Sequence, residues 1–152
     1  MYPRYHIILG FLFSLLLIII FPIGIAGFLL VFLSSFLIDF DHFMIYYFYC
    51  RKLSLKSTYK WYNKIDEKVK LLKKKSKKCK APLDIFHTIE FIFLVFLLSL
   101  YSKYFLFILI GMIFHSLLDI IDMYKRKVLF VREYSIIHFL MKRNKKEYKI
   151  VK

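Results

Sequence analysis

Residues 36–43 read FLIDFDHF, which places two aspartates and a histidine inside an otherwise apolar stretch. Carboxylates and imidazoles are costly in apolar surroundings unless they are paired or bind a cation. The same residue types stand at the ends of three further apolar runs: His6, His87, Glu90, His115, Asp119 and Asp122. Imidazole and carboxylate are donors that zinc, manganese and iron take in proteins. These residue types therefore predict a metal site.

The spacing of these residues places them in groups on single helix faces, because residues three, four and seven apart are neighbours on a helix. The groups are Asp39 with His42, His87 with Glu90, and His115 with Asp119 and Asp122. Metal sites of the carboxylate–histidine kind are built by side chains that project inward from facing helices. We therefore expect the metal ligands to be His6, Asp39, His42, His87, His115 and Asp119.

The number of candidate ligands exceeds one tetrahedral shell, so we expect either two ions or one ion with additional orienting residues. Zinc is the expected metal, with manganese and iron as alternatives. A bound divalent cation acidifies water, and a carboxylate outside the ligand set, Glu90 or Asp41, would accept the proton as general base. Asp122 is expected at the boundary of the site, where it either orients a ligand or only marks the helix end.

Several other residues have simpler interpretations. His6 taken alone is equally a residue at a helix end. Asp84 stands at the start of an apolar run, just after a proline, which favours a helix N-cap. His138 lies in the basic C-terminal segment, which favours a surface histidine. Cys50 and Cys79 lack CxxC spacing, which favours two free thiols in a reducing compartment.

Composition indicates the class of the elements that must position these residues. The 152 residues are 60% hydrophobic and 20% aromatic, with a mean hydropathy of +0.58. Soluble domains are about 45–50% apolar. The net charge is +15, and thirteen basic residues lie in 51–80 and ten after residue 124. Apolar runs that alternate with basic segments predict a multi-pass membrane protein.

The apolar runs predict four membrane spans. Residues 5–38 would extend about 51 Å as one helix, against a hydrocarbon core of roughly 30 Å. The proline and glycines of FPIGIAG (21–27) indicate a turn within this run. The expected spans cover about residues 5–21, 24–46, 85–101 and 105–121.

An even number of spans puts both termini and both basic segments, 51–83 and 125–152, on one side of the membrane. The positive-inside rule places that side in the cytoplasm. All candidate ligands then lie at the cytoplasmic ends of the spans. We expect a single membrane domain over residues 1–152, with the all-α fold of an integral membrane four-helix bundle.

The lysine-rich loop between spans two and three carries a helical pattern of its own. Apolar residues recur at spacings of three and four with lysines between them: Leu55, Tyr59, Tyr62, Ile65, Val69 and Leu72. This pattern predicts a basic amphipathic helix that lies on an anionic lipid leaflet. The expected lipid contacts are Lys60, Trp61, Lys64 and Lys68. Nucleic-acid binding is the alternative for such a stretch, but the flanking spans favour lipid, and we expect no nucleic-acid partner.

Four sequence elements resemble a known family of small inner-membrane proteins described as metal-dependent hydrolases, which includes a LexA-binding member. That family carries an N-terminal histidine, a PDxDH element, a THS element and a final sHxxxD. The counterparts here are His6, IDFDH (38–42), FHT (86–88) and FHSLLD (114–119), without the family's proline before the DxD. The resemblance covers nearly all of the predicted bundle but not the lysine-rich loop. It implies a metal-dependent hydrolase.

The expected function is therefore metal-dependent hydrolysis at the cytoplasmic membrane interface, with phosphoesters of lipids as substrates and anionic membrane lipids as partners. A proton- or metal-handling protein is one alternative. It would need polar residues that continue across the membrane, whereas the predicted spans are apolar beyond Glu90 and before His115. A non-catalytic membrane adaptor with a structural metal is the other alternative, and it predicts a closed coordination shell.

Overall fold

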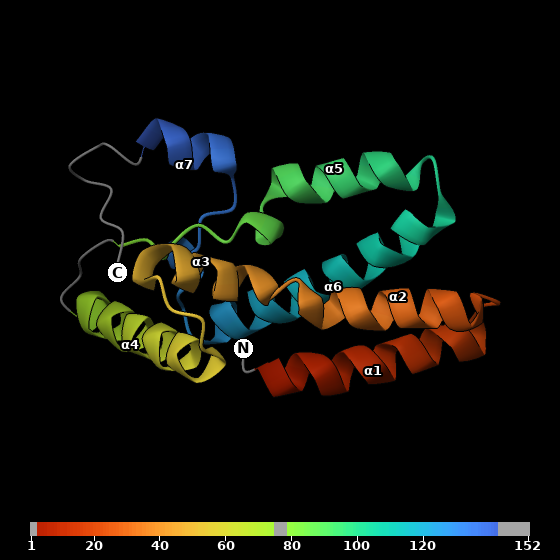
Figure 1. Ribbon diagram of the computed structural model, residues 1–152, viewed down its shortest axis with the longest axis horizontal. Helices are drawn as coiled ribbons and strands as arrows, with labels where there is room; N and C mark the ends of the chain where they lie inside the picture. The colour runs from red at the N-terminus through yellow and green to blue at the C-terminus, as the bar shows by residue number, and fades with distance from the viewer. Residues whose placement is uncertain (1–2, 75–78, 143–152) are drawn as a thin grey trace. The chain divides into compact units, whose positions relative to one another are not determined.

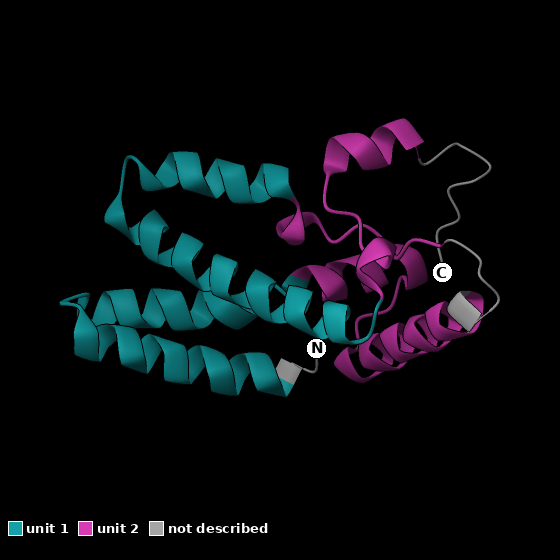
Figure 2. Ribbon diagram, turned by 180° about the vertical axis from the view of Figure 1, so that it is seen from behind, with its two compact units in different colours: residues 1–40, 89–127 teal, residues 41–88, 128–152 magenta. Residues whose placement is uncertain are grey.

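The computed structural model describes residues 3–74 and 79–142, and Figure 1 shows the order of their helices. Within these residues the fold is all-helical and contains no β-strand, which confirms the expected all-α class. The chain divides into two compact units, coloured separately in Figure 2. Unit 1 contains residues up to Phe40 and Ile89–Lys127, and unit 2 contains Asp41–Thr88 and the residues from Val128 on. Residues 143–152 of the expected basic tail lie outside the described residues.

Unit 1 consists of α1 (Pro3–Ile20), α2 (Gly24–Leu37), α5 (Ile89–Ser99) and α6 (Lys103–Lys125). α2 packs against α1 and α6, and α5 packs against α6. Short turns join α1 to α2, where the proline and glycines of FPIGIAG predict one, and α5 to α6 at residues 100–102. Gly24 adopts a φ of +66°, which glycine takes without steric cost. Ser102 caps α6 by accepting a hydrogen bond from the Tyr104 N–H at 3.4 Å.

Small residues allow α2 and α6 to approach closely. A Cβ atom added to Gly111 of α6 would clash with the Ser34 hydroxyl and the Val31 carbonyl oxygen of α2. Ser34 and Ser35 each donate a hydrogen bond from the hydroxyl to a carbonyl of their own helix at 2.7 Å. Their polar groups are therefore satisfied within this apolar contact. The close approach brings His115, one turn beyond Gly111, to the α2 backbone.

Two helical stretches are long and apolar enough to cross a membrane. One is Gly24–Cys50, 27 residues counted through a turn at its middle, and the other is Lys103–Lys125, 23 residues. Arg4–Ile20 and Ile89–Ser99 are also apolar but shorter. By length and composition the described residues thus supply two candidate spans, whereas the sequence predicts four.

The expected span 24–46 is not one continuous helix. The chain turns at Ile38 and Asp39, and α3 (Phe40–Cys50) begins directly afterwards. The prediction that Asp39 and His42 share a helix face is wrong, because that prediction requires a helix running through both residues.

The expected span 85–101 is also interrupted. A 3-10 turn, η1, covers Ile85–His87, and Thr88 is extended with φ −84° and ψ 151° before α5 begins. His87 and Glu90 therefore do not lie on one face of a common helix, contrary to the spacing argument. Neither of the two interruptions contains glycine or proline, so the apolar pattern carries no signal for them.

Unit 2 consists of most of α3, α4 (Leu55–Lys74), η1, a second 3-10 turn η2 (Leu129–Val131) and α7 (Ile136–Lys142). Helix α4 lies where the lysine-rich pattern predicts a helix. Its Trp61 ring packs against the rings of Tyr46 and Tyr49 on α3, with centroid separations of 5.9 and 5.8 Å. These contacts attach α4 to α3 through aromatic side chains.

Helix α4 has a buried face and a basic face. Thr58, Ile65 and Val69 are buried, while Leu55 and Tyr59 of the predicted apolar face are exposed. Four exposed lysines follow one another at intervals of four residues: Lys56, Lys60, Lys64 and Lys68. We call these four residues the lysine stripe. The apolar centre of α4 thus packs within unit 2, and the lysine stripe faces outward.

Candidate metal centre

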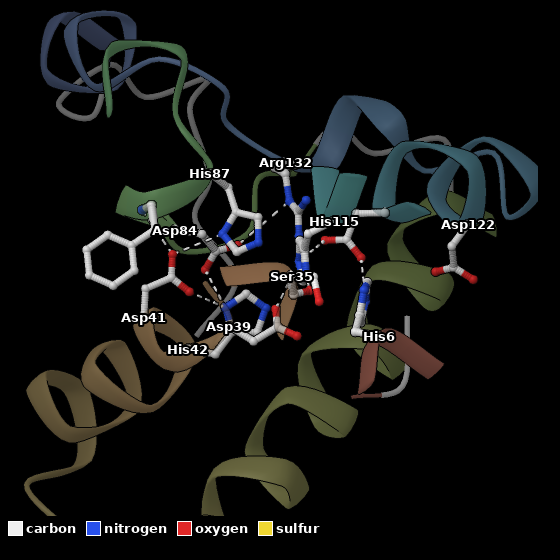
Figure 3. A network of polar contacts seen from close by, with 12 residues as sticks. His6, Ser35, Asp39, Asp41, His42, Asp84, His87, His115, Asp122 and Arg132 are labelled. Carbon is white, nitrogen blue, oxygen red and sulfur yellow. Dashed lines mark hydrogen bonds and ion pairs between the residues drawn. The ribbon is translucent and has the colours of Figure 1, made fainter. Parts of the chain in front are cut away.

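Four ionisable side chains gather in unit 1: His6 of α1, Asp39 of the turn after α2, and His115 and Asp119 of α6. Figure 3 labels the first three of them. We call them the unit 1 cluster. His6 Nε2 lies 3.2 Å from Asp119 Oδ1, and His115 Nε2 lies 3.6 Å from Asp119 Oδ2. His115 Nε2 also lies 3.4 Å from Asp39 Oδ1. Donor atoms of Asp39, His115 and Asp119 lie within 4.8 Å of one another and can hold a metal ion.

His115 is oriented by the backbone of α2. Its Nδ1 lies 2.8 Å from the carbonyl oxygen of Ser35, and the ring is completely buried. A carbonyl oxygen only accepts hydrogen bonds, so Nδ1 carries the hydrogen. The Nε2 atom then faces the two carboxylates, and in the neutral ring it would offer its lone pair to a metal ion.

His6 is buried without a hydrogen bond. Its ring is 1% exposed, and neither Nδ1 nor Nε2 makes a hydrogen bond. The ring stacks on His115 with a centroid separation of 4.0 Å. Asp119 lies at ion-pair distance from Nε2 but makes no hydrogen bond to it, so a bound cation would give this buried ring a bonding partner.

The spacing of the unit 1 cluster fits a divalent cation. A tetrahedral ion with ligand bonds of about 2.1 Å separates neighbouring ligand atoms by about 3.4 Å. Three nitrogen–oxygen separations of the cluster, 3.2, 3.4 and 3.6 Å, are close to this value, and the mutually close ligand atoms are those of Asp39, His115 and Asp119, while His6 adjoins Asp119. A cation among these atoms would also neutralise the two carboxylates and supply a partner for the His6 ring.

A second group of ionisable residues lies in unit 2, centred on Asp41 of α3 (Figure 3). His42 Nδ1 lies 2.8 Å from Asp41 Oδ1, and His87 Nδ1 lies 3.0 Å from Asp41 Oδ2. The Phe86 N–H donates a further hydrogen bond to Asp41 Oδ2 at 3.1 Å. Donor atoms of Asp41, His42 and His87 lie within 4.8 Å of one another, so this group too can hold a metal ion.

Asp84 and Arg132 extend this second group, and we call Asp41, His42, Asp84, His87 and Arg132 the unit 2 cluster. Asp84 Oδ1 lies 3.3 Å from His42 Nδ1, and Asp84 Oδ2 lies 3.8 Å from Arg132 Nε. The Asp84 side chain is buried, and its Oδ1 makes no hydrogen bond. Asp84 occupies the N-cap position of η1, as the sequence favours, but its side chain makes no capping hydrogen bond. It belongs instead to the surroundings of His42.

The remaining residues singled out in the sequence lie outside these groups. Glu90 is half-buried in the first turn of α5 and belongs to neither set of mutually close ligand atoms among the described residues. Asp122 forms an ion pair with Arg126 at 2.6 Å, one turn further along α6. His138 Nδ1 lies 2.6 Å from Glu133 Oε1, so this partly exposed histidine has a buried carboxylate partner within unit 2.

Three groups that surround the two clusters are not predicted as site residues from the sequence: the Ser35 carbonyl, Asp84 and Arg132. The first is a backbone group that no residue pattern reveals. The position of Asp84 before an apolar run is typical of a helix N-cap. Arg132 stands in a segment whose basic residues all resemble surface charges. Only the folded chain distinguishes them from their neighbours.

Comparison with models of protein families, with curated proteins and with solved structures finds no match to this chain.

Proposed function

We propose that this chain is an integral membrane protein that binds divalent cations at its His/Asp clusters and uses them to hydrolyse phosphoesters of lipids. The observation that supports this most strongly is the unit 1 cluster. Its two stacked imidazoles and two carboxylates stand at separations of 3.2–3.6 Å, and the buried His6 makes no hydrogen bond. A divalent cation would neutralise the two carboxylates and give the His6 ring a ligand bond.

Zinc is the proposed ion, because an equal mixture of imidazole and carboxylate donors suits it, with manganese or iron as alternatives. His6, Asp39, His115 and Asp119 would hold one ion in unit 1. His42 and His87 would supply nitrogen ligands in unit 2, so the chain binds one or two ions. A bound cation supplies Lewis acidity and an acidified water.

The protein side chains would divide the remaining tasks. Both oxygens of Asp41 already accept hydrogen bonds, so Asp41 is poorly suited to accept a proton from water. Glu90, a half-buried carboxylate in unit 1, is the proposed general base. Asp39 has a side chain that is 19% exposed, whereas the other members of the unit 1 cluster are fully buried. Substrate would therefore approach from the side of Asp39.

The four helices of unit 1 would form a membrane-embedded four-helix bundle with both termini in the cytoplasm. The 11-residue α5 is about 17 Å long, about half the hydrocarbon thickness. The bilayer must therefore thin around it, or residues flanking the helix must complete the span. Cysteines introduced at Lys103 and at Ser57 test this topology, since impermeant thiol reagents should label them from opposite sides. Labelling of both from the same side would contradict the four-span bundle.

Anionic lipids of the cytoplasmic leaflet are the proposed partners. Lys60, Lys64 and Lys68 are exposed on α4, and Trp61 lies next to them in the sequence. Basic residues on a membrane-proximal helix attract anionic headgroups. The same attraction would concentrate lipid phosphoesters near the unit 2 residues.

Hydrolysis of defined phospholipids by the purified protein tests the proposal. Wild type stripped of metal should be inactive and should regain activity with zinc or manganese. Glu90→Gln should bind the ion but lose activity, and Asp66→Gln is the matched control because Asp66 is a partly exposed acid paired with Lys70. Turnover that is unaffected by chelation would contradict metal-dependent hydrolysis.

A non-catalytic adaptor with a structural metal is the second candidate. It is supported by the burial of His6, His115 and Asp119, which would leave little room for a substrate. A structural ion requires a closed shell of protein ligands. An ion whose spectroscopic signature does not change on addition of phosphate or fluoride would favour the adaptor over the hydrolase.

A further inference from the structure

We propose that Asp41 is a positioning residue that holds both imidazoles of the unit 2 cluster in the tautomer required to bind a cation. The inference deepens the proposed function and rests on it for the role of the cation. It assigns to Asp41 a task different from the general base predicted from the sequence, and it ties His42 and His87 to a single carboxylate.

The geometry around Asp41 is that of a fully used hydrogen-bond acceptor. The side chain is 2% exposed, and it receives His42 Nδ1 at 2.8 Å, His87 Nδ1 at 3.0 Å and the Phe86 N–H at 3.1 Å. Phe86 and His87 lie in η1, so the 3-10 turn presents a backbone donor and a ring donor to the same oxygen. One carboxylate thereby joins α3 to η1.

The chemistry of these bonds determines the tautomers. An ionised carboxylate only accepts, so the hydrogen of each bond resides on Nδ1 of His42 and of His87. In a neutral imidazole with Nδ1 protonated, Nε2 carries the lone pair that binds a metal. A carboxylate at the non-coordinating nitrogen also raises the basicity of the ligating nitrogen and fixes the ring orientation.

The neighbouring carboxylate, Asp84, does not perform this task. Its Oδ1 is 3.3 Å from His42 Nδ1 but makes no hydrogen bond, because the hydrogen of that nitrogen is directed to Asp41. The other Asp84 oxygen faces the guanidinium of Arg132 at 3.8 Å. Asp84 therefore adds negative charge beside the histidines, and Asp41 sets which nitrogens are available.

The first test uses the wild-type protein without any metal. Nitrogen NMR of histidine-labelled protein in micelles reports which ring nitrogen carries the hydrogen, and the chain has only five histidines to assign. We expect the Nδ1–H tautomer for His42 and His87. An Nε2–H tautomer at either ring would overturn the proposal, whatever the outcome of the activity assays.

The second test is the variant Asp41→Asn, which replaces one accepting oxygen by a donating amide. The ring that meets the amide NH2 group must then present a lone pair at Nδ1 and carry its hydrogen on Nε2, so its Nε2 no longer offers a lone pair to a metal. In a His115→Ala background, where unit 1 lacks a ligand, we expect zinc affinity to fall about 10- to 100-fold. We also expect one of the two rings, His42 or His87, to change from the Nδ1–H to the Nε2–H tautomer.

Glu133→Gln is the matched control, because Glu133 is a second buried carboxylate of unit 2 that is bonded to a histidine, His138. This variant should alter the His138 signal and leave zinc affinity unchanged. Unchanged tautomers in Asp41→Asn, or equal losses of zinc affinity in both variants, would contradict the positioning role. Absence of zinc binding by the wild type would sink the proposed function, but the tautomer measurement would still decide this inference.

Discussion

The two clusters contain the same residue types but differ in how many hydrogen bonds their side chains make. In unit 1, Asp119 is approached by two imidazole nitrogens at 3.2 and 3.6 Å, and His6 makes no hydrogen bond. In unit 2, Asp41 accepts three hydrogen bonds at 2.8–3.1 Å. Burial is equally deep for both aspartates. The difference lies in what occupies the space around the carboxylate.

Asp119 is therefore suited to bind a cation directly, and Asp41 is suited to orient the histidines that bind one. A buried carboxylate that accepts several N–H hydrogen bonds is stable without a cation, whereas one that accepts none from the imidazoles beside it gains more from a bound cation. Unit 1 thus has the stronger requirement for a cation. Unit 2 has rings that are already held in place before a cation arrives.

The largest effect is expected from His115→Ala. His115 approaches both carboxylates of the unit 1 cluster, and loss of an orienting partner alone costs about 10- to 100-fold in metal affinity. We therefore expect the affinity of the unit 1 ion to fall by more than about 100-fold, measured by competition with a zinc chelator. His138→Ala, which removes a histidine of unit 2 outside the cluster, should retain wild-type affinity. Equal zinc affinity in His115→Ala and His138→Ala would contradict the assignment of His115 as a ligand of the unit 1 ion.

A smaller effect is expected from Gly111→Ala. The added methyl group meets the Val31 carbonyl of α2, and overpacking of this kind costs about 1–3 kcal/mol. Denaturation in mixed micelles should report that loss in the free energy of unfolding. Because His115 lies one turn away, the affinity of the unit 1 ion should fall as well. Ser116→Ala is the control on the same helix, since its buried hydroxyl makes no hydrogen bond and its removal should be nearly neutral.

The lysine stripe allows the proposed lipid contact of unit 2 to be tested separately from metal binding. Replacing Lys60, Lys64 and Lys68 by glutamine should lower the affinity of α4 for anionic lipid at least about tenfold, because each lysine near an anionic surface contributes about 1 kcal/mol. Trp61, the single tryptophan, allows this to be followed by fluorescence in nanodiscs of increasing anionic content. Lys103→Gln should behave as wild type. A response independent of the three lysines would contradict lipid contact by α4.

The smallest effect concerns the two thiols of unit 2. Burial raises the pKa of the Cys79 thiol, while Cys50 is only half-buried at the end of α3. Thiolate is the reactive form, so at neutral pH a maleimide should modify Cys50 several-fold faster than Cys79. Mass spectrometry of partially labelled protein measures the ratio. Faster modification of Cys79 would contradict its burial.

Part of this architecture follows from the sequence alone. Apolar runs and lysine-rich segments predict the all-α class, and the spacing of His115 and Asp119 places them together because α6 is continuous through both. The corresponding argument fails for Asp39 with His42 and for His87 with Glu90. Asp39 itself lies in the turn before α3, and Thr88 is extended between His87 and Glu90; neither place has a glycine or proline to indicate it.

The partners of each ligand could not be predicted for a different reason. The Ser35 carbonyl, the Phe86 N–H and the close approach at Gly111 depend on which helices and turns pack together, and periodicity within one helix carries no such information. Asp41 and Asp39 stand two residues apart, and nothing in the local sequence shows that Asp41 accepts three hydrogen bonds while Asp39 lies 3.4 Å from His115 Nε2.

Elemental analysis of detergent-purified protein tests the central claim most directly, with His115→Ala and Asp39→Ala measured beside the wild type and His138→Ala as control. We expect stoichiometric zinc, manganese or iron in the wild type and the control, and loss of an ion in both cluster variants. Wild-type protein that contains no metal, even after reconstitution with zinc, would contradict the account, and the buried histidines and aspartates would then require a proton-linked or structural role.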